Sequence, residues 1–260
     1  MNSPLQAMET AARLAGDLLM GRLQHLHELK VEAKGLNDFV TAADREAEEA
    51  IAASLEASCP GIPFLAEESA GRKSGASSRF IVDPLDGTTN FIHGYPFFSV
   101  SIAYQDAGAI QQGVVFDPSR DEMFSAGRGE GTTLNGTAIR VSGREDLSGS
   151  LLVTGFPFKE LARLDEYLEG FRRLLKVSAG VRRDGSAALD LAWVAAGRSD
   201  GFWEMGLSPW DVAAGGLLVA EAGGQVSDYQ GGDDWLEGRS IVAATKGLHT
   251  AMRRAVTGTG

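Results

Sequence analysis

The segment that most restricts the fold is FIVDPLDGTTNF, residues 80–91, in which an apolar run ends at two acids, Asp83 and Asp86. Apolar strand ends tolerate few charges, and two carboxylates so close in sequence repel each other. A cation between them would remove the repulsion. The segment therefore predicts a strand that ends at a cation-binding site and is followed by a Gly-Thr-Thr-Asn turn.

Three further apolar segments also carry acids at an end: DFVTAAD (38–44), PFLAEES (63–69) and SPWDVAAG (208–215). Because α/β folds build their sites where strands end and helices start, we expect these acids to converge. Oxygen ligands without His or Cys favour Mg²⁺, with Mn²⁺ or Ca²⁺ as alternatives. The four histidines do not stand at zinc-ligand spacing, which leaves the carboxylates as the candidate ligands.

Each acid also has a simpler explanation when it is taken alone. A Gly-rich turn accounts for the acids of residues 83–86. Helix capping accounts for Asp44, and the first turn of a helix accounts for Asp211. Solvent at a strand end accounts for Glu67. These separate explanations do not account for the whole pattern, because four separate elements each carry an acidic residue at an end.

The turn after the two acids predicts a place for an anion. Gly87, Thr88 and Thr89 allow close approach to the backbone, and amides that open a helix form an anion-binding nest. Metal ions beside such a nest make a phosphate site. The net charge of −11, from 24 basic and 35 acidic residues, is then compatible with a phosphorylated substrate, since bound cations make the pocket attractive to phosphate.

Composition limits the class of protein. The same acidic balance argues against nucleic-acid partners and anionic membrane surfaces. The single cysteine, Cys59, excludes an internal disulfide and a cysteine-rich zinc site. The N-terminus lacks the pattern of a signal peptide, and apolar stretches such as AALDLAWVAAG (187–197) are interrupted by a charge and too short to span a bilayer. We expect a soluble cytoplasmic protein.

The elements alternate in a way that predicts a mixed α/β protein of stacked helix and sheet layers. We expect one domain over residues 1–260, with a soft lobe boundary near residue 145. The predicted helices are 4–30, 42–57, 161–176, 186–197, 210–222 and 247–256. The predicted strands are 62–66, 79–83, 97–104, 109–116, 122–126, 138–142, 150–154, 200–205 and 239–244.

The four acidic segments resemble the signature segments of the inositol monophosphatase family, Mg²⁺-dependent and lithium-sensitive phosphatases. RRDGSAALDLAWVAAGRSDGFWE (182–204) and EAGGQVSD (221–228) extend the resemblance in order over nearly the whole chain, and the variants are those of bacterial members. The resemblance implies a layered α-β-α-β-α sandwich of the sugar-phosphatase type, two or three Mg²⁺ ions per site and a homodimer.

The resemblance also assigns roles to residues. It implies that the metal ligands are Glu67, Asp83, the Leu85 carbonyl, Asp86 and Asp211. In the family, metal-activated water attacks the phosphate. Thr88 matches the hydroxyl beside that water, and Asp44 matches the acid that shares its proton and helps to hold a further metal. The catalytic set is thus Glu67, Thr88 and Asp44.

The remaining matched positions concern the substrate. The amides of Gly87 and Thr88 match the phosphate cradle. The positions that contact the sugar or cyclitol ring are Gly185, Ser186, Ala187 and Glu204. The resemblance therefore implies a phosphomonoesterase acting on inositol-1-phosphate or a related small polyol or sugar phosphate.

Alternatives remain open. On the same scaffold, relatives act as histidinol-phosphatases, fructose-1,6-bisphosphatases or phosphatases of NADP and 3′,5′-bisphosphate nucleotides. An aspartyl-phosphate phosphatase of the haloacid dehalogenase type is disfavoured, because its motif places the acids two apart, whereas Asp83 and Asp86 are three apart. A regulatory phosphosugar-binding subunit is the non-enzyme alternative, and a further protein partner is left open.

Overall fold

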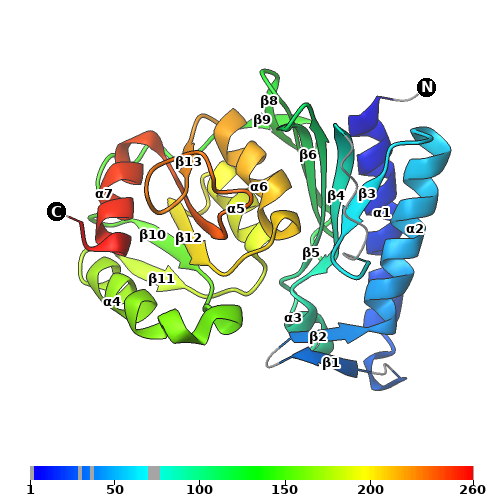
Figure 1. The fold of residues 1–260 in the computed structure, drawn as a ribbon, viewed down its shortest axis with the longest axis horizontal. Coiled ribbons are helices and arrows are strands. Elements are labelled where there is room, and N and C mark those ends of the chain that lie inside the picture. Colours follow the sequence, from blue (N-terminus) through cyan, green and yellow to red (C-terminus); the bar gives the residue numbers. More distant parts are fainter. Residues whose placement is uncertain (1–2, 29–30, 36–37, 70–76, 260) are drawn as a thin grey trace.

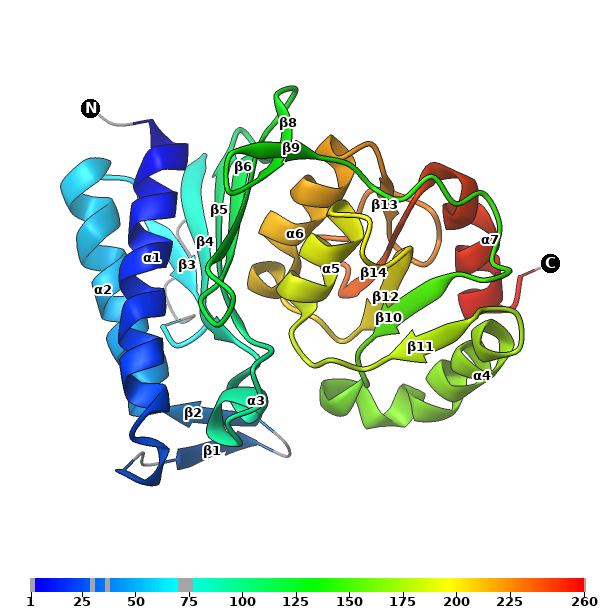
Figure 2. The same cartoon turned by 180° about the vertical axis from the view of Figure 1, so that it is seen from behind.

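The computed structural model describes residues 3–28, 31–35, 38–69 and 77–259. Its elements stack in five layers: a helix pair, a sheet, a second helix pair, a second sheet and a third helix pair (Figure 1). The view from behind shows the same order of layers (Figure 2). The predicted layered α-β-α-β-α sandwich is confirmed.

The first sheet has seven strands in the order β3-β4-β5-β6-β7-β8-β9. β3 pairs with β4 in parallel, and the other neighbours are antiparallel. The strands are β3 (Phe64–Ala66), β4 (Ser78–Asp86), β5 (Ser99–Asp106), β6 (Ala109–Asp117), β7 (Glu122–Gly127), β8 (Gly131–Leu134) and β9 (Thr137–Ile139).

The second sheet has five strands in the order β11-β10-β12-β14-β13. These are β10 (Leu151–Thr154), β11 (Gly180–Arg182), β12 (Gly201–Met205), β13 (Gln225–Ser227) and β14 (Ser240–Ala244). A separate antiparallel pair joins β1 (Val31–Gly35) and β2 (Asp38–Thr41). The seven-stranded sheet thus ends before residue 145 and the five-stranded sheet begins after it, while the single-domain description stays a prediction.

The helices cover the sheets in pairs. α1 (Pro4–Leu23) and α2 (Ala42–Ser58) lie on the outer face of the first sheet, and α4 (Leu164–Leu175) and α7 (Lys246–Thr257) lie on the outer face of the second (Figure 1). α5 (Ala187–Ala195) and α6 (Pro209–Glu221) fill the space between the sheets. The short helices are α3 (Thr88–Ile92), η1 (Leu26–Glu28) and η2 (Phe158–Arg163).

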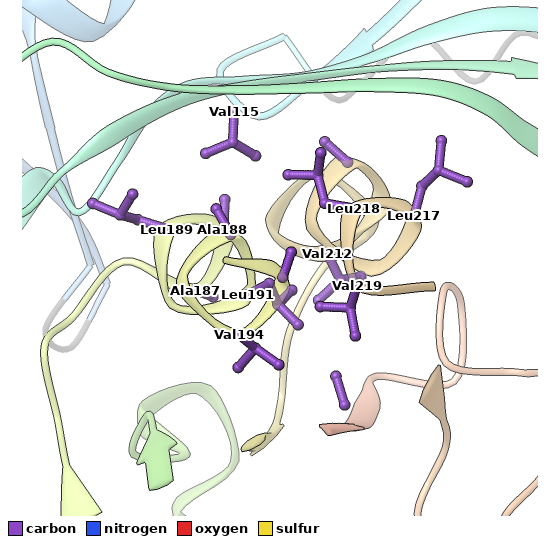
Figure 3. Close-up of a cluster of buried hydrophobic side chains, with 14 of the residues drawn as sticks. Val115, Ala187, Ala188, Leu189, Leu191, Val194, Val212, Leu217, Leu218 and Val219 are labelled. Carbon is purple, nitrogen blue, oxygen red and sulfur yellow. The ribbon is translucent and has the colours of Figure 1, made fainter. Parts of the chain in front are cut away.

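The central helix pair is apolar on nearly every side because it has a sheet on both sides. Leu189 and Leu218 are fully buried, and Val115 of β6 points from the first sheet towards the two helices (Figure 3). Burying side chains of this size stabilises the fold by about 1.5–3 kcal/mol each. The packing fixes the starts of α5 and α6 relative to the end of β4.

The structure corrects several predicted boundaries. The helix predicted over 4–30 ends at Leu23, where a turn and η1 follow, and residues 29 and 30 lie outside the described residues. The strand predicted over 138–142 ends at Ile139. The helix predicted over 161–176 is divided between the end of η2, which runs to Arg163, and α4, which starts only at Leu164.

Short elements were missed. They are β1, β2, β8, β11, β13 and α3, none longer than five residues. Segments of this length are too short to establish a hydrophobic period, so only tertiary pairing defines them. The other predicted helices and strands are confirmed to within two residues at most ends, and β4 extends to Asp86 rather than ending at residue 83.

Candidate metal and phosphate site

Three of the predicted metal ligands converge. One carboxylate oxygen from each of Asp83, Asp86 and Asp211 lies within 4.8 Å of the other two. Asp83 and Asp86 come from the end of β4, and Asp211 lies in the first turn of α6. The site therefore lies where the first sheet meets the central helices.

An irregularity in β4 makes this convergence possible. Residues three apart on a regular strand point to opposite faces of the sheet. The pairing of β4 with β5 shifts register between Asp83 and Asp86, and the amide of Leu85 donates a 3.0 Å hydrogen bond to Oδ1 of Asp83. A bulge of this kind re-aims side chains next to a site. Here it brings both carboxylates to one side.

The start of α5 holds Asp86. The Ser186 hydroxyl donates a 2.6 Å hydrogen bond to Oδ2 of Asp86, and the amide of Ala188 donates a second one of 2.7 Å to the same oxygen. The hydroxyl of Ser186, which the resemblance assigned to ring contact, is thus engaged with Asp86. Ser186 also lines the cleft, so its contact with the substrate ring stays a prediction.

Asp211 and Glu67 approach from two other elements. Oδ2 of Asp211 accepts a 2.7 Å hydrogen bond from the amide of Ser208, which closes the start of α6. Glu67 follows β3, where its amide donates to the Val82 carbonyl at 3.2 Å, and its side chain lines the cleft beside the three aspartates. Glu67 lies outside the compact trio, and its place among the metal ligands stays a prediction.

The site carries a dense negative charge. Burial raises the pKa of Asp83 well above its usual range, and repulsion from Glu67 and Asp86 raises it further. Burial likewise raises the pKa of Asp86 to about 6, and burial followed by repulsion from Glu67 raises that of Asp211 to about 7. Buried like charges this close are unfavourable without a counter-ion. An all-oxygen donor set of this kind fits a hard divalent cation such as Mg²⁺.

Thr88 and Asp44 form a second part of the site. The Thr88 hydroxyl lies 3.0 Å from the carbonyl oxygen of Leu85 and 3.1 Å from Oδ1 of Asp44. Oδ2 of Asp44 accepts hydrogen bonds from the amide and the hydroxyl of Thr41, at 2.8 and 2.7 Å, so Asp44 also caps α2. Burial raises the pKa of Asp44. The capping explanation and the predicted contact with Thr88 therefore both hold.

Gly87 allows the sharp turn between the acids and α3. Its φ of +100° is one that residues with side chains rarely adopt. A Cβ atom there would lie 3.1 Å from the Phe97 carbonyl oxygen and 3.3 Å from that of Gly185. No side chain caps the start of α3 in the described part of the chain. The phosphate cradle at Gly87 and Thr88 stays a prediction with this geometry in its favour.

One cleft of about 380 Å³ is lined by Glu67, Asp83, Leu85, Asp86, Gly87, Thr88, Ser186 and Asp211, whereas Asp44 is not among its lining residues. Gly185, Ala187 and Glu204 also line the cleft, and their contacts with the substrate ring stay a prediction. Glu204 is buried, and its carboxylate packs against Gly155 so closely that a Cβ atom there would lie 2.1 Å from Oε2. Burial raises the pKa of Glu204 well above its usual range, while Arg183 opposes the shift.

The cleft contains residues that the sequence analysis missed. Phe156, Phe158, Lys159 and Arg183 lie on its wall, and the guanidinium of Arg183 lies 5.6 and 5.4 Å from the ring centres of the two phenylalanines. Asp190 is the other missed residue. It was noticed only as the charge that interrupts the apolar run 187–197, and a lone acid in an apolar helix was the available signal.

Comparison with known proteins gives consistent matches over the whole chain. The profile of the inositol monophosphatase family matches residues 1–258. A Nus factor SuhB of Pseudomonas aeruginosa is 51% identical over 93% of this chain and 91% of that protein. An inositol-1-monophosphatase of Mesorhizobium japonicum is 47% identical over 97% of this chain and 95% of that protein.

Solved structures agree with these matches. The extragenic suppressor protein suhB of Bartonella henselae superposes with a TM-score of 0.95 at 43% identity, with 100% of both chains covered. The inositol monophosphatase of Anabaena superposes with a TM-score of 0.87 at 40% identity, covering 98% of this chain and 96% of that one. Within the described residues, no helix has the length and apolar character needed to cross a bilayer.

Proposed function

Because the chain belongs to the inositol monophosphatase family, we propose that it is a Mg²⁺-dependent phosphomonoesterase that hydrolyses inositol-1-phosphate or a related small polyol or sugar phosphate. The observation that carries the proposal is the convergence of the Asp83, Asp86 and Asp211 carboxylates within 4.8 Å. All three residues line one cleft, and Asp211 lies in the first turn of α6.

The acids of the cleft would hold the metal ions. Asp83, Asp86 and Asp211 offer clustered oxygens, Glu67 adds a fourth carboxylate beside them, and the Leu85 carbonyl lies at the same turn. When bound, Mg²⁺ supplies a Lewis acid that lowers the pKa of water and neutralises phosphate charge.

The chain's own groups position the water and the substrate. The Thr88 hydroxyl, 3.1 Å from Oδ1 of Asp44, is placed to hold a water proton and pass it to that carboxylate. The raised pKa of Asp44 makes it a better proton acceptor near neutral pH than an exposed aspartate. In this proposal the amides of Gly87 and Thr88 would bind phosphate oxygens, and Glu204 would accept hydrogen bonds from hydroxyls of the leaving alcohol.

The test is phosphate release in the presence of Mg²⁺ from inositol-1-phosphate, histidinol phosphate, fructose-1,6-bisphosphate, NADP⁺ and adenosine 3′,5′-bisphosphate. We expect the highest kcat/KM with a polyol or sugar monophosphate, and no turnover in excess chelator. A preference for one of the other esters would select the corresponding alternative. Binding of inositol-1-phosphate without any turnover would favour a regulatory phosphosugar-binding subunit instead.

A second candidate function comes from relatives. Nus factors SuhB of Pseudomonas aeruginosa and Escherichia coli are 51% and 46% identical to this chain. We propose that the chain also serves as a Nus factor. The test is whether it replaces the Escherichia coli relative in cells that lack it. Replacement by both the wild type and Asp86→Asn would show that this role does not need hydrolysis.

A further inference from the structure

Asp190 lies in the cleft without a structural partner. It stands in the first turns of α5, four residues after Ser186, and is 2% exposed. Its Oδ1 is buried with no hydrogen-bond partner in the described part of the chain. A buried acceptor without a partner destabilises a fold, so native proteins keep such groups mainly for function or for ordered water.

Other groups perform the structural roles that an acid could have at this position. The start of α5 is capped by Ser186, whose hydroxyl accepts from the Leu189 amide at 3.4 Å. The clustered metal ligands are the three aspartates at 83, 86 and 211, and Asp190 is not among them. Asp190 instead lines the same cleft as Glu204.

We infer that Asp190 is a second hydroxyl-binding residue, which together with Glu204 selects an alcohol with at least two free hydroxyl groups. This rests on the proposed phosphatase function and deepens it by adding a residue that determines which alcohol is accepted. The charges around Asp190 agree with such a role, since Asp184, Glu204 and Asp86 disfavour its negative charge while Arg183 favours it. Asp190 lines the cleft, so a substrate hydroxyl group bound there would donate to its carboxylate.

Two carboxyl groups on one wall discriminate more strongly than one. A site built to hydrogen-bond a substrate hydroxyl rejects an analogue without it, because the buried polar group is then left unpaired. The matched pair of substrates is inositol-1-phosphate and cyclohexyl phosphate, which share a six-membered ring and differ in their hydroxyl groups. Their ratio of kcat/KM measures how strongly the cleft recognises hydroxyl groups.

The decisive variant is Asp190→Asn. We expect the ratio of kcat/KM for inositol-1-phosphate to that for cyclohexyl phosphate to fall roughly tenfold, mainly through KM. The matched control is Asp117→Asn on β6, a buried acid that accepts hydrogen bonds from the Ser119 hydroxyl and Arg120 at 2.6 and 2.7 Å. We expect this control to lower the unfolding temperature and leave the ratio as in the wild type.

Thermal unfolding without metal supplies an independent readout. We expect Asp190→Asn to unfold at the wild-type temperature or above it, because burial and repulsion from neighbouring acids disfavour a carboxylate charge at this position and the amide carries none. An unchanged ratio, or equal losses on both esters with a lowered unfolding temperature, would overturn the inference. If the wild type hydrolyses neither ester, the proposed function fails, and calorimetric binding of inositol-1-phosphate decides instead: wild-type affinity in Asp190→Asn then overturns the role, and weaker binding supports it.

Discussion

The Ser186 hydroxyl donates a 2.6 Å hydrogen bond to Oδ2 of Asp86, which lies 100 positions earlier in the chain. Asp86 ends β4 of the first sheet, and Ser186 precedes α5 between the sheets. The carboxylate is thus oriented by an element from the other half of the molecule. The candidate metal site is complete only when the first sheet and the central helices have packed together.

The first prediction concerns this hydrogen bond. Ser186→Ala removes the side-chain donor and leaves Asp86 with the backbone amides of Ala187 and Ala188. Groups that orient a metal ligand typically contribute 10- to 100-fold to metal affinity, and we expect a loss of about this size for Mg²⁺, measured by calorimetry. Ser125→Ala is the control, because Ser125 is buried and bonded to Glu9, on the opposite face of the first sheet. Equal Mg²⁺ affinity in both variants would show that Ser186 does not position the ligand.

A second prediction concerns Asp86 itself. Asp86→Asn keeps the shape of the side chain and removes one charge, so we expect kcat to fall by at least about a hundredfold, since a bound metal contributes several kcal/mol of transition-state stabilisation. Mg²⁺ at about 100 times its Kd should raise the unfolding free energy of the wild type by about 2.7 kcal/mol. The variant should show little of this shift in a thermal scan. Normal turnover in the variant, or full wild-type activity in chelator, contradicts the metal assignment.

The third prediction is a pH dependence of the metal-free protein. Folding raises the pKa of Asp86 to about 6 and that of Asp211 to about 7, from 3.8 in the unfolded chain. Between pH 3.8 and about 7 the folded state binds more protons than the unfolded state, so raising the pH lowers the free energy of unfolding. In chelator, the unfolding temperature should therefore fall as the pH rises from about 5 to about 8.

Mg²⁺ should reverse most of this loss above neutral pH, because the cation replaces the protons as the counter-charge. The control is Asp86→Asn, which lacks one of the two titrating groups and should show a flatter profile in chelator. A wild-type unfolding temperature that rises with pH over this range would mean that the acids are not crowded in the metal-free protein.

The convergence of Asp83, Asp86 and Asp211 could be predicted from the sequence, because apolar segments carry these acids near their ends. The sequence did not predict how Asp83 and Asp86 reach the same side, since the register shift in β4 depends on pairing with β5. Asp190 was missed for a related reason. In the sequence it interrupts an apolar helix, and only the packed structure shows that Asp190 lines a cleft. Local patterns predict elements, whereas the neighbours of a buried charge are a tertiary property.

The last prediction tests the hydroxyl-binding side of the cleft without changing any charged group. Gly155 lies against Glu204, and a Cβ atom there would lie 2.1 and 2.2 Å from its two carboxylate oxygens. Gly155→Ala must therefore displace the Glu204 carboxylate, which is the free end of a flexible side chain. The metal ligands are not among the atoms that the new methyl group would meet.

We expect Gly155→Ala to raise KM for inositol-1-phosphate by about tenfold, since a hydrogen bond to a charged group contributes about 1.5–3 kcal/mol and the displaced carboxylate keeps part of it. The effect on cyclohexyl phosphate should be much smaller. Gly143→Ala is the control, because a Cβ atom there meets nothing within 4 Å. If Gly155→Ala weakens both esters equally, Glu204 supports the metals or the fold rather than the recognition of hydroxyl groups.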